Sequence, residues 1–192
     1  METLKEKVAR VVKEAVEVVP YDPAWPLRFE KEKRHLQNLF PADWIRRIEH
    51  FGSTAVPGLC AKPIVDMLVE VRSLEMVRIQ MAPVLEKEGY DYFWRPSFGD
   101  AGPPYYAWFI KRDAAGKRTH HLHMVEAHFE HWERLAFRDY IRTHPDVAAE
   151  YGRLKQRLAM ELKQDRAAYT HAKGEFIQRV SRLARRGTFD GA

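Results

Sequence analysis

Apolar positions repeat with helical spacing near the start of the chain and throughout its last third. Spacings of three and four residues predict one helix over residues 3–15 and a second over 24–40. The same spacing returns over residues 129–144, after Pro145, and from about residue 173 onward. The two ends of the chain are therefore expected to be helical.

Between these helices, β-branched and aromatic residues gather in short runs that turn-forming residues separate. The runs predict five strands, over residues 44–52, 63–71, 90–96, 105–112 and 119–127. A further helix, divided by Pro83, is expected over 74–89. The run PIVDMLVEV, residues 63–71, is apolar on both faces, which is typical of a central strand.

This order of elements predicts an α+β fold: one mixed β-sheet with helices packed on it and a helical C-terminal third. A length of 192 residues fits a single domain, and 45% apolar with 31% charged residues is the composition of a globular protein. We expect an N-terminal helical extension over residues 1–15, a single domain over 16–186 and a frayed tail over 187–192.

A small excess of basic over acidic residues bears on which classes of molecule the chain can bind. Lys and Arg number 32 against 27 Asp and Glu, a formal net charge of +5. This balance favours an anionic partner, either a nucleotide or a phosphorylated small molecule, although ordinary solubility explains it equally well. The basic residues are dispersed among acidic ones, so a nucleic acid is not expected.

No apolar run approaches the roughly 18 residues of a membrane span, and with one cysteine the chain has no disulfide framework. We therefore expect a cytoplasmic protein without a membrane partner.

The stretch HFGSTAVPG, residues 50–58, is the first candidate for chemistry. Gly52 follows a predicted strand, where a glycine lets the backbone approach a ligand. Backbone N–H groups of such a turn can hold a phosphate, with Ser53 and Thr54 adding hydroxyl donors and Lys62 a positive charge. An ordinary surface loop is the alternative.

Asp66 stands fourteen positions after Gly52, inside the strand that follows the turn. If the two strands are neighbours, its carboxylate lies beside the turn. Mg²⁺ is commonly bound by one or two carboxylates together with phosphate oxygens. The pattern therefore predicts a turn that holds phosphates and an aspartate that holds their Mg²⁺.

A second candidate is the histidine-rich strand THHLHM. His121 and His123 share one face of a strand, while His120 points away from them. Two imidazoles on one face can bind a metal, accept a proton or hydrogen-bond to phosphate, and a structural pair is the alternative. A zinc site from His123, His128 and His131 would have to cross the predicted junction between strand and helix.

Two arginines complete the candidate set. Arg112, at the end of a predicted strand, and Arg138, near the apolar face of a predicted helix, could stabilise charge on a transferred group. For Arg138 the alternative is a structural ion pair with Asp139 or Glu133. The P-loop and Rossmann glycine motifs are absent, which excludes those nucleotide-binding folds.

Several blocks in this order, HFGSTAVPGLCAKPIVD, THHLHM, FRDYIR and YGRLK, resemble the GrpB family of bacterial proteins, over residues 17–183. The resemblance implies a nucleotidyltransferase-type sheet in which a strand ends at a Gly-Ser turn, here Gly52 and Ser53. The next strand then carries metal-binding acids, of which Asp66 is the first.

The position where that pattern has its second acid is Leu68 in this chain. Glu70 is on the same face two residues further along, and His121 and His123 stand where a third strand usually offers another acid. The resemblance also implies a link to nucleotides or coenzymes, because related domains occur fused to dephospho-CoA kinase.

Two functions remain open from the sequence. The first is Mg²⁺-dependent nucleotidyl or phosphoryl transfer to a small acceptor. In this scheme Asp66 holds the metal, helped by Glu70 or His123, and His121 or Glu49 acts as the base. The second is a catalytically silent accessory module that binds a nucleotide or another anionic ligand, for which Leu68 is the best evidence.

Overall fold

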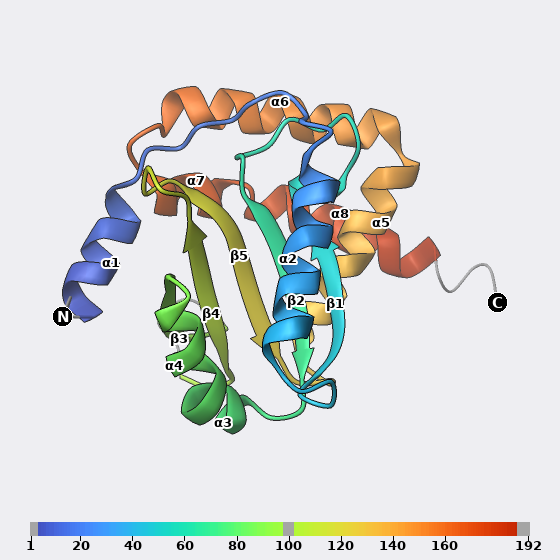
Figure 1. The fold of residues 1–192 in the computed structure, drawn as a ribbon. Coiled ribbons are helices and arrows are strands. Elements are labelled where there is room, and N and C mark those ends of the chain that lie inside the picture. Colours follow the sequence, from blue (N-terminus) through green and yellow to red (C-terminus); the bar gives the residue numbers. More distant parts are fainter. Residues whose placement is uncertain (1–3, 98–101, 188–192) are drawn as a thin grey trace. The chain divides into compact units, whose positions relative to one another are not determined.

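The computed structural model describes residues 4–97 and 102–187, and it forms two compact units (Figure 1). One unit takes Pro23–Ala55 and Ile64–Trp132 and contains the sheet. The other takes the chain up to Asp22, the segment Val56–Pro63 and the chain from Glu133 onward. The range predicted as a single domain, 16–186, contains parts of both units, and most of the predicted tail lies outside the described residues.

The sheet has five strands in the order β1-β2-β5-β4-β3. Their bounds lie within two residues of the prediction: β1 Ile45–Phe51, β2 Val65–Val71, β3 Tyr90–Pro96, β4 Tyr105–Arg112 and β5 Arg118–Val125. Neighbouring strands are antiparallel except β2 and β5, which are parallel. The strand β2 is interior, as its apolar sequence predicts, and the pairing of β1 shifts register between Ile45 and Arg47.

Helix α2, Trp25–Leu39, contacts β1 and β2 in this unit (Figure 1). Its Phe29 ring stacks on His50 of β1 at 4.8 Å between centroids. The helix predicted over 74–89 consists of α3 Leu74–Met76, the π-helical turn η2 Val77–Met81 and α4 Ala82–Lys87. The irregular turn lies just before Pro83, which has no N–H to donate to a helical hydrogen bond.

The other unit contains helices α1, α5, α6, α7 and α8. Their bounds are α1 Leu4–Lys13, α5 Arg134–Thr143, α6 Pro145–Glu161, α7 Arg166–Ala172 and α8 Gly174–Gly187. Its core gathers Val56 and Leu59 with side chains of α5, α6 and α8. Helix α7 was not predicted as a separate helix; it begins where the side chain of Asp165 accepts a hydrogen bond from the Ala168 N–H. Among the helices of the described residues, none has both the length and the apolar character needed to cross a bilayer.

The mixed sheet, the helices and their order confirm the predicted α+β fold class.

Candidate functional site

Strand pairing brings one carboxylate and two imidazoles to the same face of the sheet. In the parallel pair of β2 and β5, Asp66 is opposite His121 and Leu68 is opposite His123. Directly paired residues project to the same side of a sheet, and residues two apart on one strand do so as well. Asp66, His121 and His123 therefore converge although they come from strands that are distant in the sequence.

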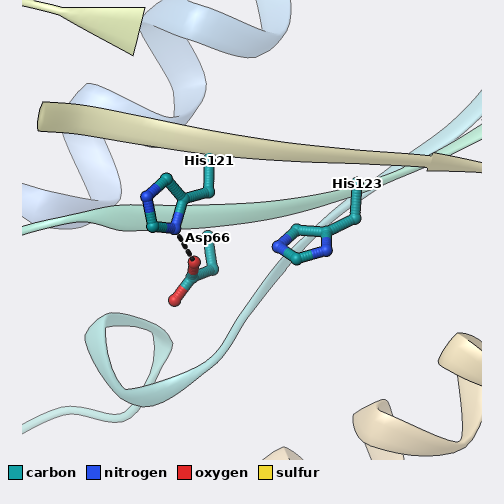
Figure 2. A group of neighbouring side chains, drawn as sticks. All are labelled: Asp66, His121 and His123. Atoms are coloured by element: carbon teal, nitrogen blue, oxygen red, sulfur yellow. Dashed lines mark hydrogen bonds and ion pairs between the residues drawn. The ribbon is translucent and has the colours of Figure 1, made fainter. Parts of the chain in front are cut away.

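The three side chains are close enough to share one ligand (Figure 2). Nδ1 of His121 lies 3.1 Å from Oδ1 of Asp66. One ligand atom from each of Asp66, His121 and His123 lies within 4.8 Å of the other two. The histidines are 7% and 9% exposed, whereas the Asp66 side chain is 30% exposed. The carboxylate is therefore the part of the group that is most open to solvent.

The Gly-Ser turn lies directly against this carboxylate. Phe51, the last residue of β1, pairs with Asp66, so the turn begins beside it. Gly52 has a φ of +72°, and a Cβ at this position would lie 2.6 Å from Oδ2 of Asp66. Only glycine meets both conditions, because other residues resist this φ and would collide with the carboxylate. The turn and the Asp66 carboxylate therefore lie side by side, as the sequence predicts.

The hydroxyl of Thr54 makes its hydrogen bonds within the protein. The side chain is 1% exposed. Its Oγ1 donates to the carbonyl oxygen of Ile64 at 3.3 Å and lies 3.0 Å from Nε2 of His50. Since the single hydroxyl hydrogen goes to Ile64, Nε2 of His50 is the donor in the second bond. The Thr54 hydroxyl therefore joins the turn, whose helical part η1 is Ser53–Ala55, to the residue before β2.

Aromatic rings surround the two imidazoles. Phe51 meets His123 edge-on at 5.2 Å, Tyr106 stacks on the same ring at 5.5 Å, and Trp108 meets His121 edge-on at 5.1 Å between centroids. These contacts hold the rings in place and keep bulk water away from them. Local sequence patterns do not reveal these neighbours, because they come from β1 and β4.

The other predicted metal ligands are placed differently. Leu68 is fully buried beside His123, so no second acid stands there. Glu70 is two residues further along β2 and does not belong to the group of ligand atoms. His131 is near His123, with ring centroids 6.0 Å apart, but His128 is exposed. Within the described residues the alternative zinc set of His123, His128 and His131 does not assemble.

The two predicted arginines are engaged in ion pairs. Nε of Arg112 lies 3.0 Å from Oδ2 of Asp91, and its guanidinium also donates to the Gly116 carbonyl in the hairpin turn. Arg138 holds both carboxylate oxygens of Asp139, at 2.7 and 3.0 Å. For Arg138 this is the structural alternative that the sequence left open.

Lys62 belongs to the helical unit, as Arg138 does. Its Nζ lies over the ring of Tyr169, 5.6 Å from the centroid.

A family model described as "GrpB protein" matches residues 15–182. The chain belongs to the GrpB family. It is 39% identical over 175 residues to the UPF0157 protein YqkA of Bacillus subtilis, covering 91% of this chain and 48% of that protein. It is 36% identical to the glutamate-rich protein GrpB of Alkalihalophilus pseudofirmus, covering 88% of this chain and 96% of that one. The sequence resemblance is thus confirmed, and the chain spans about half the length of the Bacillus subtilis relative.

A crystal structure of the conserved protein GrpB from Enterococcus faecalis has the same fold. It aligns with a TM-score of 0.75 at 33% identity, over 90% of this chain and 99% of that one. The fold described above is therefore shared with this member of the GrpB family.

Proposed function

We propose that this GrpB chain binds one divalent transition-metal ion through Asp66, His121 and His123, and that the ion acts on a phosphate-bearing small molecule. The observation that carries the proposal is the convergence of three ligand atoms within 4.8 Å of one another. Metal–ligand bonds of about 2.0–2.2 Å to nitrogen and carboxylate oxygen allow one ion to be reached by all three after small side-chain movements.

The donor set suits a transition metal better than the Mg²⁺ expected from the sequence. Mg²⁺ takes oxygen ligands in octahedral geometry, whereas two of the three donors here are imidazole nitrogens. Imidazoles with one carboxylate favour Zn²⁺, Fe²⁺, Mn²⁺ or Ni²⁺. Three protein ligands also leave a coordination position open for a ligand, as in catalytic metal sites.

The reaction class that this site supports best is phosphoryl or nucleotidyl transfer to a small acceptor, with one metal ion. An ion at the open position would polarise a phosphate oxygen, and backbone N–H groups of the glycine turn, which lies against Asp66, could donate to the same phosphate. Leu68 in place of a second acid argues against two-metal chemistry. The same leucine favours the second candidate, a silent module that binds a metal and an anionic ligand without turnover.

Metal titration tests the centre. We expect chelator-treated protein to bind one equivalent of Zn²⁺ or Mn²⁺ by calorimetry, more tightly than Mg²⁺. Asp66→Asn and His123→Gln should each weaken binding at least tenfold, while the exposed control His128→Gln should leave it unchanged. A wild-type chain that binds no divalent ion contradicts the proposal.

Turnover separates the two candidates. The metal-loaded protein is incubated with nucleoside triphosphates and small hydroxyl acceptors. Release of pyrophosphate is followed for nucleotidyl transfer, and release of nucleoside diphosphate for phosphoryl transfer. For an enzyme, Asp66→Asn should lower the rate by roughly 10²–10³. Metal-dependent stabilisation by a nucleotide without any product would instead favour the silent module.

A further inference from the structure

The helical unit contains a surface hollow of about 770 Å³. Every residue that lines it belongs to this unit: Pro20 and Tyr21, the segment 56–60, the end of α5 and the N-terminal part of α6. The volume falls in the range of roughly 300–1,000 Å³ that is usual for sites of small organic ligands. The three proposed metal ligands belong to the unit of the sheet and do not line it.

Small side chains on α6 leave the space open. Ala148, Ala149 and Gly152 line the hollow from successive turns of this helix. At Gly152 the helix packs closely on the segment 56–60, since an added Cβ would lie 3.6 Å from Sγ of Cys60 and 3.7 Å from Cδ1 of Leu59. Leu59 is buried and belongs to the core of the unit. The floor of the hollow is therefore apolar and is held in place by core packing.

One guanidinium group at the hollow is not used by the fold. Arg153 lines the hollow and is exposed, and within the described part of the chain no hydrogen bond, ion pair or ring contact engages its side chain. Glu150, one turn earlier on α6, is paired with Arg179 at 2.6 Å. Arg142 also lines the hollow, but its guanidinium lies 3.6 Å from the Asp139 carboxylate. Among the described residues no acidic side chain lines the hollow, so its charge is positive.

We propose that this hollow binds a small organic anion, with an apolar or aromatic body against Val56 and Leu59 and a carboxylate or phosphate group at Arg153. A guanidinium presents a planar pair of donors that fits either group. The apolar floor gains from covering the body of the ligand, and the single charge fixes its orientation. An uncharged ligand would leave the guanidinium unused, and a hydrated inorganic ion would leave the floor uncovered.

The test is fluorescence titration in EDTA with two probes that share one aromatic body. Anilinonaphthalene sulfonate carries an anionic group, and phenylnaphthylamine lacks it. We expect the sulfonate to bind more tightly than the neutral probe. Arg153→Gln should weaken sulfonate binding about tenfold, the typical effect of one charge-assisted hydrogen bond, and leave the neutral probe unaffected. The matched control Arg157→Gln changes an exposed arginine one turn further along α6, outside the hollow, and should alter neither titration.

Cys60 reports where the probe binds, because it lines the hollow and is the single cysteine of the chain. Its labelling by iodoacetamide is followed by mass spectrometry. At a sulfonate concentration of about ten times Kd the labelling rate should fall about tenfold, since only the unoccupied fraction can react.

Filling the hollow gives an independent variant. Ala149 lines the hollow and is exposed, so Ala149→Trp can occupy the space without entering the core. We expect this variant to bind neither probe and to melt at the same temperature as the wild type. Undiminished binding of both probes to a folded Ala149→Trp chain contradicts the proposal.

The remaining outcomes are equally decisive. Equal affinity for the two probes, full sulfonate binding by Arg153→Gln, or an unchanged rate of Cys60 labelling each overturns the site, as does a wild type that binds neither probe. The inference goes beyond the metal centre and needs no metal. Asp66→Asn should therefore bind the sulfonate as the wild type does, so that failure of one proposal is distinguishable from failure of the other.

Discussion

Gly52 is the residue on which the shape of the candidate site depends most directly. Its backbone takes a φ of +72°, and the space that a side chain would need is filled by Oδ2 of Asp66. The same glycine thus serves the turn and the carboxylate at once. Replacing it changes local backbone strain and the position of a proposed metal ligand together.

Gly52→Ala is therefore expected to cost about 1–3 kcal/mol in unfolding free energy and to weaken metal binding at least tenfold, measured by urea unfolding and calorimetry. Gly116→Ala is the matched control, because Gly116 has a φ of +76° but nothing within 4 Å of the Cβ that an alanine would add. The control variant should lose only the unfolding free energy that comes from placing an alanine at a positive φ. Equal metal affinities in the two variants would mean that the contact with Asp66 does not matter.

The sequence predicts the placement of some single side chains and not the contacts of others, for a physical reason. The shared face of His121 and His123 follows from the two-residue period of a strand, so it could be predicted. The hydrogen-bond and ion-pair partners of Thr54 and Arg112 could not be predicted. A sequence does not tell which carbonyl, carboxylate or ring will lie beside a polar side chain once distant segments have come together.

At the scale of elements, helix α2 is tied to the sheet by a buried carboxylate. Glu32 is 3% exposed and accepts hydrogen bonds from the Tyr90 hydroxyl and from Nζ of Lys111, the latter at 2.5 Å. Burial, followed by the Glu32 charge, raises the pKa of Tyr90. One helical side chain therefore joins α2 to both β3 and β4.

Glu32→Ala should lower the unfolding free energy by roughly 3 kcal/mol, because it leaves the Lys111 ammonium group without its partner. The measurement is urea unfolding at neutral pH. Glu30→Ala removes an exposed acid two residues earlier on the same helix and should cost far less. Similar losses for the two variants would show that the buried link contributes little.

Elements were predicted better than side-chain contacts, since each strand carries its own local pattern. The hydrophobic periodicity of each segment, together with the turn-forming and helix-breaking residues between and within them, predicts all five strands and the irregular helix at Pro83. Helix α7 was not distinguished as a separate helix because it is only seven residues long, RAAYTHA, and lacks an apolar stripe. The parallel pairing of β2 with β5 is a long-range property that no local pattern specifies.

At the scale of the molecule, the chain passes between its two units several times. The division was not predicted, because Val56–Pro63 packs with helices that lie far along the sequence.

The N-terminal helix is the simplest part to remove. The family match begins at residue 15, and Val8 of α1 is 45% exposed.

Deletion of residues 2–13 is expected to change the unfolding free energy by less than about 1 kcal/mol. The reason is that the next anchor, the hydrogen bond from the Val16 N–H to the Lys163 carbonyl, remains. Thermal unfolding and metal titration of the shortened chain check this. A large drop in melting temperature, or loss of metal binding, would give α1 a role that its exposure does not suggest.

The parallel pairing of β2 and β5 also has a consequence for synthesis in the cell. Asp66 and His121 are 55 positions apart, and β5 fits between β2 and β4. The carboxylate leaves the ribosome long before the imidazoles that it will meet. During this interval the three proposed ligands have not yet met, so the proposed metal centre can form only after β5 has paired with β2.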